Sequence, residues 1–392
     1  MLKIMPIYGT RPEAIKMAPI VKQLEKSNLF DCIVAVTGQH RMMLDQVNEL
    51  FGITPIYDLN IMRERQSLTS IMSRTLVGLE KIFVADRPDA VIVQGDTTTS
   101  TAAAMAAFYH GIPVVHAEAG LRSGDLQSPF PEEANRRLTS QISSLHLAPT
   151  DASRQNLVRE GISLENIVIT GNTVIDALMH VVNKRVSFAD KRLQSLVESG
   201  RKLMLVTTHR RENIGDGMVN IGMAVAEVAD LHPELSVVFP LHLNPAVRDI
   251  VLPFLENREN IFVTEPLSYG EFTRLLDAST LVLSDSGGVQ EEAPSLGKPV
   301  LVMRMNTERP EAVAAGTVRL VGTDAKLIVK EVNMLLGDPE HYLRMAKAVN
   351  PYGDGFAAAR TVAAIGHMFG VCDRVADFDY ASSLTDISIG TL

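Results

Sequence analysis

The sequence predicts an α/β protein made of two doubly wound parallel-sheet domains, and three observations lead to this class. The chain has 392 residues, which is more than one ordinary hydrophobic core supports and about right for two. Short runs rich in Val, Ile and Leu alternate with longer helix-like segments almost from end to end. The two halves also begin alike, because an apolar run leads into a polar, basic turn at residues 7–14 and again at 206–213.

The apolar runs are predicted to be strands that are buried on both faces. They mostly lack the strict alternation that marks a half-exposed sheet, so a parallel sheet is favoured. Helix-like segments between them, such as 13–26 and 99–109, fit right-handed crossover connections. The predicted strands are 2–8, 32–37, 90–94, 113–117 and 145–148 in the first half, and 202–207, 236–241, 261–264, 281–284, 300–303 and 318–321 in the second.

The boundary between the two domains is predicted near residues 170–173. We therefore expect an N-terminal domain over 1–170 and a C-terminal domain over 171–354. A helix over 355–370 follows the last strand and is expected to cross back onto the first domain, while the tail over 371–392 shows no strong pattern. Because ligands of doubly wound sheets bind beyond the carboxyl ends of the strands, functional residues are expected just after each apolar run.

Composition argues against several classes of protein. The formal net charge of −9 disfavours nucleic-acid binding, which normally needs a basic face. The two cysteines, Cys32 and Cys372, lie at opposite ends of the chain and make no disulfide framework, so a reducing compartment is expected. The N-terminal apolar run is too short for a signal peptide, and no stretch has the length of a membrane span. These features predict a cytoplasmic protein without membrane or nucleic-acid partners.

The usual cofactor and metal motifs do not occur in a suitable context. GDGFAA at 353–358 resembles a dinucleotide-binding loop, but it follows an Asn-Pro-Tyr segment and is better explained as the first turn of a helix. The Gly-Lys pair at 297–298 is followed by proline and makes no P-loop. None of the ten histidines forms an HExxH pair. We therefore expect no cofactor and no metal.

The segment LSDSGGVQEEAPSLGKPV at 283–300 is the strongest sign of ligand binding. Ser286-Gly287-Gly288 follows a predicted strand and opens a helix, so its backbone N–H groups can receive phosphate oxygens at the positive end of the helix dipole. Ser286 adds a hydroxyl donor, and Glu292 can accept hydrogen bonds from a ribose. A plain Gly-Gly turn with solvated acids is the alternative. The phosphate site is favoured because two basic residues, Arg304 and Arg309, follow the next strand.

Basic residues also follow the first strand of each half. Arg11, with a planar guanidinium, and Lys16, a compact charge, are predicted to meet a diphosphate, although Lys16 could equally be a solvated helix residue. In the second half His209 lies between a strand end and two arginines, which favours a phosphate contact, and His242 follows the next strand.

Acidic residues gather at strand ends in the first half. Asp96 and Glu118 each follow a buried strand directly, and Glu132 and Glu133 lie with Arg136 in SPFPEEANRR. A single carboxylate here could be a helix cap, and Asp96 before three threonines is a candidate N-cap. Several acids in one site raise one another's pKa, which suits general acid and base chemistry near neutral pH.

Together these segments resemble a known family. GTRPEAIKMAP, VTGQHR, GDTTTS, EAGLRS, SPFPEEANRR, ITGNTVIDAL, HRREN, HLNP, DSGGVQEEAPSLGKPVLVMR, TERPEA and NPYGDG occur in this order from about residue 3 to residue 365. In this respect the sequence is similar to the bacterial non-hydrolysing UDP-N-acetylglucosamine 2-epimerases.

The resemblance implies a fold like that of the GT-B glycosyltransferases, with two Rossmann-like domains facing a central cleft, usually as a homodimer. It also implies interconversion of UDP-N-acetylglucosamine and UDP-N-acetylmannosamine without a cofactor. In this family anti elimination of UDP gives 2-acetamidoglucal, and UDP adds back after reprotonation of C2 on the opposite face.

The resemblance also implies three groups of site residues. The UDP ligands are Arg11, His209, Ser286, Gly287, Gly288, Glu292 and Arg309. The catalytic group is Asp96, Glu118 and Glu132, supported by Lys16, Arg136 and His209. Many bacterial members have a regulatory site for UDP-N-acetylglucosamine, and the matching positions are Gln39, His40, Arg65, Glu133, Arg210 and His242. The chain departs from the family at Met42, where a polar residue is expected, and at Met305-Asn306, where the usual run is more acidic and Thr-rich.

Three alternative functions remain open at this point. A retaining glycosyltransferase of the same architecture would share the UDP site but need an acceptor pocket. A hydrolysing epimerase would release free N-acetylmannosamine and UDP. A non-catalytic nucleotide-sugar sensor would bind its ligand and close without any exchange at C2.

Overall fold

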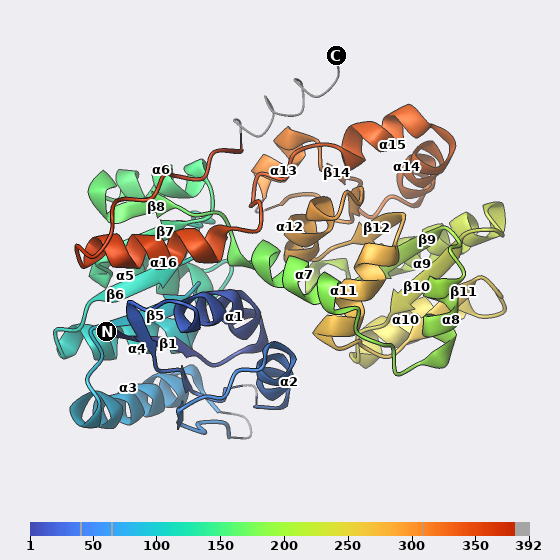
Figure 1. Ribbon diagram of the computed structural model, residues 1–392. Coiled ribbons are helices and arrows are strands. Elements are labelled where there is room, and N and C mark those ends of the chain that lie inside the picture. The colour runs from blue at the N-terminus through green and yellow to red at the C-terminus, as the bar shows by residue number, and fades with distance from the viewer. Residues whose placement is uncertain (40, 64–65, 308, 381–392) are drawn as a thin grey trace, which may run out of the picture. The chain divides into compact units, whose positions relative to one another are not determined.

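The structure is a computed structural model that describes residues 1–39, 41–63, 66–307 and 309–380 (Figure 1). Its internal contacts divide the chain into two compact units. Met1–Ala177 and the described chain from Tyr352 onward form the first unit, and Leu178–Pro351 form the second. Helix α7 (Thr173–Lys184) runs from one unit into the other.

The first unit is built on a parallel sheet of eight strands. These are β1 (Leu2–Tyr8), β2 (Phe30–Cys32), β3 (Ala35–Val36), β4 (Tyr57–Asp58), β5 (Ala90–Gln94), β6 (Val114–Ala117), β7 (Leu145–Ala148) and β8 (Ile167–Ile169). Their order is β4-β3-β1-β5-β6-β7-β8, with β2 paired to β1 as well. Every pair is parallel.

Two details of this sheet differ from the sequence prediction. The run 32–37, predicted as one strand, is divided between β2 and β3, because these two pair with different stretches of β1. Strands β4 and β8 lie outside the predicted set, since each has only two or three residues and no long apolar run marks it.

Helices cover the sheet of the first unit. They are α1 (Arg11–Glu25), α2 (Arg41–Phe51), α3 (Leu68–Ala85), α4 (Thr98–Tyr109), α5 (Glu132–Ile142), α6 (Asp151–Arg159), the 3-10 turn η1 (Leu164–Asn166) and α16 (Ala357–Met368). Helix α16 lies along α1 and also contacts β7 (Figure 1). Because α16 begins within the GDGFAA segment, the prediction that this segment starts a helix is confirmed.

The chain after α16 follows the edge of the first sheet. The N–H of Phe378 donates to the carbonyl of Ile169 at 2.7 Å, and the N–H of Ile169 donates to the Asp377 carboxylate at 2.9 Å. Arg374 donates to the carbonyl of Ile167 at 2.8 Å. This stretch therefore satisfies backbone groups of the edge strand β8 that would otherwise be open to another chain.

Asp176 in α7 holds the start of α16. Its carboxylate accepts hydrogen bonds from the backbone N–H groups of Ala358 at 2.8 Å and Ala357 at 3.2 Å. Burial nevertheless raises the pKa of Asp176 from 3.8 to about 6, against the effect of these hydrogen bonds. The folded protein therefore binds this proton more tightly than the unfolded chain does.

We expect Asp176 to make the free energy of unfolding fall as the pH rises. Because its pKa is raised on folding, its contribution is fully present below pH 3.8 and is lost as the pH rises through about 6. Asp176→Asn should remove this fall, measured by urea unfolding followed by circular dichroism at about pH 4 and about pH 7.

A second capping acid gives the opposite trend and serves as the control for Asp176. Asp338 accepts hydrogen bonds from the N–H groups of His341 and Glu340, and these bonds lower its pKa. Asp338→Asn should therefore remove a contribution that is present at neutral pH and is lost in acid. If Asp176→Asn kept the wild-type pH dependence, the role given to Asp176 would be wrong.

The second unit is built on a parallel sheet of six strands. They are β9 (Leu203–Thr207), β10 (Ser236–Pro240), β11 (Ile261–Thr264), β12 (Leu281–Ser284), β13 (Val300–Val302) and β14 (Val318–Leu320), in the order β11-β10-β9-β12-β13-β14. The helices are α8 (Lys191–Glu198), the 3-10 turn η2 (Arg211–Asn213), α9 (Asp216–Leu231), α10 (Pro245–Leu255), α11 (Tyr269–Ala278), α12 (Gly287–Ser295), α13 (Pro310–Ala315), α14 (Ala325–Gly337) and α15 (Pro339–Ala346).

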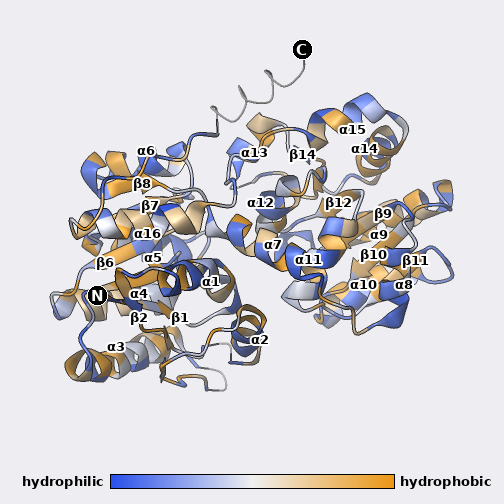
Figure 2. Ribbon diagram, in the orientation of Figure 1, coloured by the Kyte–Doolittle hydropathy of each residue, from blue (hydrophilic) through white to orange (hydrophobic). Residues whose placement is uncertain are grey.

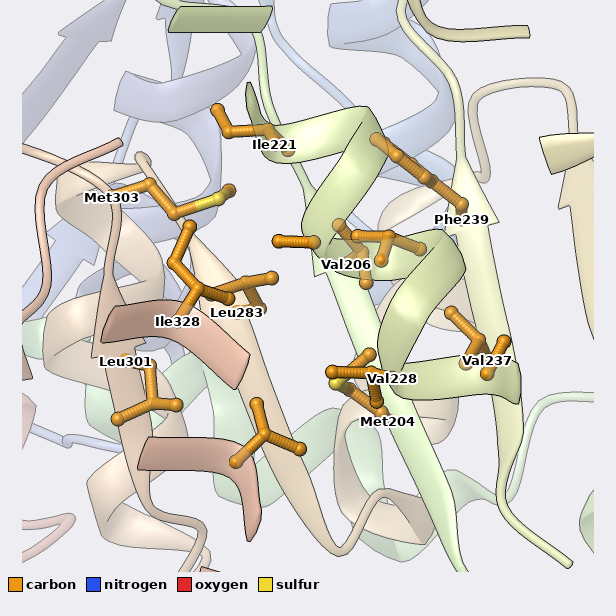
Figure 3. Close-up of a cluster of buried hydrophobic side chains, with 14 of the residues drawn as sticks. Met204, Val206, Ile221, Val228, Val237, Phe239, Leu283, Leu301, Met303 and Ile328 are labelled. Atoms are coloured by element: carbon orange, nitrogen blue, oxygen red, sulfur yellow. The ribbon is translucent and has the colours of Figure 1, made fainter. Parts of the chain in front are cut away.

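Fully buried aliphatic side chains hold helix α9 to this sheet (Figure 3). Ile221 and Val228 lie seven residues apart and so project from one face of the helix toward Met204 and Val206 of β9. Each such side chain stabilises the fold by roughly 1.5–3 kcal/mol through burial. The helices of both units carry hydrophilic residues as well as hydrophobic ones (Figure 2), as expected for helices that cover a sheet on one side and meet water on the other.

Each sheet has one point at which the strand order reverses. In the first sheet the chain passes from β1 to β3 and β4 on one side and then returns to β5 on the other. In the second sheet β9 has β10 on one side and β12 on the other. The prediction of doubly wound parallel α/β units is confirmed, and the reversal points are where such sheets bind ligands.

Candidate functional site

Asp96 and Arg136 form an ion pair just beyond the carboxyl end of β5. The turn after β5 supplies Asp96, and α5 supplies Arg136. The guanidinium places Nε 2.9 Å and Nη2 2.7 Å from Oδ2 of Asp96. The suggestion that Asp96 is an N-cap is wrong, because Thr97 caps α4 by accepting a hydrogen bond from the N–H of Ser100.

Glu118, just after the neighbouring strand β6, is held by three donors. Lys16 forms an ion pair with its Oε1, the Asn172 amide donates to the same oxygen at 3.1 Å, and the Gln94 amide donates to Oε2 at 2.7 Å. The alternative in which Lys16 is a solvated helix residue is therefore wrong. Glu118 also has a left-handed φ of +59°, which is uncommon outside glycine and accumulates at functional sites.

The charges of these four residues act on one another. Burial raises the pKa of Asp96 above its ordinary value, the negative charge of Glu118 raises it further, and the positive charges of Arg136 and Lys16 oppose the rise. A raised pKa makes a carboxylate a better proton acceptor than an ordinary one, and such shifts are common among catalytic acids and bases. The cluster is therefore a candidate acid–base site.

Two buried polar residues fix the turns that carry this cluster. Glu13 accepts hydrogen bonds from the N–H of Thr10 at 2.8 Å and from the hydroxyl of Thr97 at 2.6 Å, so it ties the turn after β1 to the turn after β5. His116 in β6 places Nε2 2.7 Å from the carbonyl oxygen of Gly95. Burial lowers the pKa of His116 to about 4, so the ring is neutral and donates to that carbonyl.

Other predicted residues of the first unit have different surroundings. Arg11 and Glu132 are the first residues of α1 and α5, and within the described part of the chain neither side chain has a hydrogen-bond or ion-pair partner. Glu133 is fully buried and accepts hydrogen bonds from Arg136 and Arg137. Gln39 accepts a hydrogen bond at 2.9 Å from Thr99.

Asp285 is the centre of the site in the second unit. Its carboxylate is fully buried directly after β12 and accepts hydrogen bonds from the N–H groups of His209 at 3.1 Å and Arg210 at 3.0 Å. The Thr208 hydroxyl at 2.7 Å and the Asn213 amide at 3.0 Å also donate to it. One carboxylate thus joins the HRREN turn after β9 to the loop after β12, on the two sides of the reversal point.

The predicted phosphate loop leads into the N-terminus of α12. An arginine lies beside its first glycine and a glutamate beside its second. Ser286 is the N-cap of α12, which begins at Gly287 as predicted. A Cβ at Gly287 would lie 3.2 Å from the Arg309 guanidinium, and a Cβ at Gly288 would lie 3.3 Å from Oε1 of Glu292. The glycines therefore allow a cation and a carboxylate to approach the first turn closely, a suitable arrangement for the phosphate and the ribose of a nucleotide.

The basic residues Arg309 and His209 each lie beside an acidic residue of the second unit. Nε of Arg309 lies 2.8 Å from Glu291. The His209 ring has Nδ1 3.3 Å from Asp285 and stacks on His242 with ring centroids 6.3 Å apart. Burial is the main cause that lowers the pKa of His209, and a diphosphate beside the ring would favour its charged form.

Comparison with known proteins identifies the family. The sequence matches the protein family described as UDP-N-acetylglucosamine 2-epimerase over residues 22–366. The chain belongs to the UDP-N-acetylglucosamine 2-epimerase family. It is 53% identical over 370 residues to the UDP-N-acetylglucosamine 2-epimerase of Escherichia coli strain K12, an alignment that covers 93% of this chain and 98% of that protein.

Solved structures of the 2-epimerase family share the fold. The Neisseria meningitidis UDP-GlcNAc 2-epimerase bound to UDP-GlcNAc is 49% identical with a TM-score of 0.84, covering 93% of this chain and 99% of that one. The S. aureus protein MnaA in complex with UDP is 45% identical with a TM-score of 0.86, covering 97% and 100%. The predicted family resemblance and GT-B-like fold are confirmed.

The regulatory site that the 2-epimerase resemblance implies stays a prediction. His40 and Arg65 lie outside the described residues. Two departures from the family pattern, Met42 and Met305, have side chains that are 82% and 81% exposed.

Over the described ranges of the chain, no helix is both long and apolar enough to cross a membrane, and no cluster of three metal-ligating side chains occurs.

Sequence reasoning missed several residues that organise the site of this 2-epimerase family member. Asp285 stands in the quoted LSDSGG motif directly after a strand, so its position was a usable signal. Gln94 and Asn172 gave no comparable signal, because their roles depend on contacts with residues far away in the sequence. Glu13 gave a partial signal, because Thr10 and Glu13 have the spacing of a capping box at the start of α1.

Proposed function

We propose that this protein is a non-hydrolysing epimerase that interconverts UDP-N-acetylglucosamine and UDP-N-acetylmannosamine at C2. The observation that carries the proposal is the cluster of two carboxylates, Asp96 and Glu118, held by Arg136 and Lys16. The relative from Escherichia coli is named for this substrate, and the Neisseria meningitidis enzyme was solved with UDP-GlcNAc bound. A glycosyltransferase would have less use for clustered acids.

In the proposed mechanism UDP leaves before the proton is removed. The C2 hydrogen is not acidic while C1 is saturated, so a carboxylate alone cannot abstract it. When the C1–O bond breaks, its electron pair leaves with UDP and C1 becomes cationic. The proton on C2 can then pass to a carboxylate, and the C2–H electron pair forms the C1–C2 double bond of 2-acetamidoglucal.

Addition of a proton from a second group to the opposite face of C2 inverts that centre. The double bond takes up the proton at C2, and the phosphate oxygen of UDP adds to C1. Electrons balance within the substrate, so the reaction needs no oxidant or reductant. The two faces of C2 require two proton-transfer groups, for which Asp96, Glu118 and Glu132 are the proposed set.

Stabilisation of the departing UDP is assigned to the second unit together with Arg11. The start of α12 offers N–H groups to the phosphates, and Arg309 and His209 supply positive charge. Glu292 is the proposed acceptor for the ribose hydroxyls. In this proposal the acids act at C2 and the cations act at the diphosphate.

Incubation with UDP-N-acetylglucosamine in deuterated water tests this function. We expect deuterium at C2 of both UDP-sugars, seen by NMR and mass spectrometry, while UDP and free sugar do not accumulate. Accumulation of N-acetylmannosamine and UDP would indicate a hydrolysing epimerase. An unlabelled donor that reacts only with an acceptor would indicate a glycosyltransferase, and binding without turnover would indicate a sensor.

A further inference from the structure

A hydrogen bond joins Tyr269 to Glu292 within the second unit. Tyr269 is the first residue of α11, and its hydroxyl donates to Oε2 of Glu292 on α12 at 3.2 Å. The start of α11 is itself fixed, because the Ser268 hydroxyl donates to the Glu271 carboxylate at 2.7 Å and the two residues cap the helix reciprocally. The tyrosine hydroxyl is thus presented by a rigid turn.

This hydroxyl is a permanent donor. Burial raises the pKa of Tyr269 well above 10.0, and the negative charge of Glu292 raises it further. A phenol that stays protonated can always donate to the neighbouring carboxylate, here across 3.2 Å. The bond therefore restrains one end of the Glu292 side chain.

The position of the Glu292 carboxylate matters because it lies beside the phosphate loop. Its Oε1 approaches the first turn of α12 so closely that a Cβ at Gly288 would lie 3.3 Å away. In a nucleoside diphosphate the ribose follows the phosphate through a single CH₂ group, so ribose hydroxyls fall near this oxygen. A carboxylate attracts these hydroxyls but repels phosphate. The Glu292 carboxylate must therefore be held close to the ribose and away from the phosphates.

We propose that Tyr269 is a positioning residue for ribose recognition, because it holds the Glu292 carboxylate where this group accepts hydrogen bonds from the ribose hydroxyls. The inference rests on the proposed function, since it takes UDP as the ligand. A carboxylate can accept several hydrogen bonds, so the bond from tyrosine and the bonds from ribose are compatible.

Tyr269→Phe tests the proposal because it removes only the hydroxyl. Binding of UDP and of 2′,3′-dideoxy-UDP is measured by calorimetry for the wild type and the variant. We expect the wild type to prefer UDP by about tenfold or more, and Tyr269→Phe to reduce this preference by roughly three- to tenfold. In turnover, KM for UDP-N-acetylglucosamine should rise while kcat stays the same, because the ribose is remote from C1 and C2.

Tyr342→Phe is a matched control in the same unit. The Tyr342 hydroxyl donates to the carbonyl of Thr280 at 3.0 Å, so this variant loses a tyrosine hydrogen bond without touching Glu292. It should keep the wild-type preference for UDP. If Tyr269→Phe weakened the binding of UDP and of the dideoxy analogue equally, or left both affinities unchanged, the positioning role would be disproved.

A double-mutant cycle with Glu292→Ala gives an independent test. If the tyrosine acts through the carboxylate, Tyr269→Phe should change ribose preference in the wild-type background but not in the Glu292→Ala background, which has no acceptor oxygen at this position. Equal effects in both backgrounds would contradict the proposal. Failure of the wild type to bind UDP at all would instead count against the proposed function, so the two failures are distinguishable.

Discussion

Asp96→Asn is expected to reduce deuterium incorporation at C2 by about 10³-fold while changing the affinity for UDP by less than about threefold. The substitution preserves the size of the side chain but removes the group that exchanges a proton. Arg136 keeps the Glu133 carboxylate 3.3 Å from its Nη1, so the cation is not left without a counter-charge. The UDP ligands proposed at the start of α12 and just after β9 belong to the second unit, so a substitution in the first unit should leave their geometry unchanged.

Asp31→Asn is the matched control for Asp96→Asn. Asp31 is an exposed aspartate of β2 in the same unit, so its conversion to asparagine should leave both exchange and UDP affinity at wild-type values. Wild-type turnover in Asp96→Asn would show that the acid–base assignment is wrong. Loss of exchange together with a large loss of UDP affinity would show that Asp96 acts in binding rather than in proton transfer.

Apolar runs predicted the fold well because most strands of the two sheets are buried on both faces. Strands β1, β5, β7, β11 and β12 begin and end at the residues that the runs predicted. The run 32–37 was wrongly predicted as one strand, because hydrophobicity indicates that a segment is buried and does not indicate which strand it pairs with. It cannot show that β1 pairs first with Phe30–Cys32 and then with Ala35–Val36.

The ends of the predicted strands indicated where the acidic residues gather, but they could not indicate which basic residue pairs with each acid. Asp96 and Glu118 follow neighbouring strands of a parallel sheet, so their proximity follows from topology. That Arg136 pairs with Asp96 and Lys16 with Glu118 depends on how α5 and α1 pack against the sheet. Such packing depends on side-chain contacts between distant segments, which the spacing of residues in the sequence does not record.

Asp285→Ala is expected to lower the free energy of unfolding by about 3–5 kcal/mol, because it leaves several buried donors without an acceptor. The N–H groups of His209 and Arg210, the Thr208 hydroxyl and the Asn213 amide all lose their partner at once. Urea unfolding followed by circular dichroism measures the loss. Asp324→Ala is the control, since it removes an exposed helix cap in the same unit and should cost only about 1 kcal/mol.

A second substitution, Asp285→Asn, separates a structural role of Asp285 from a role in ligand binding. Asp285→Asn keeps one acceptor oxygen and should fold, yet its amide cannot serve all four donors from residues 208–213 with the strength of a carboxylate. If the buried carboxylate positions His209 for the diphosphate, Asp285→Asn should weaken UDP binding by about tenfold under conditions in which the protein remains folded. Wild-type affinity for UDP in a folded Asp285→Asn variant would mean that the turn holds its shape without the charge. The carboxylate would then serve stability alone.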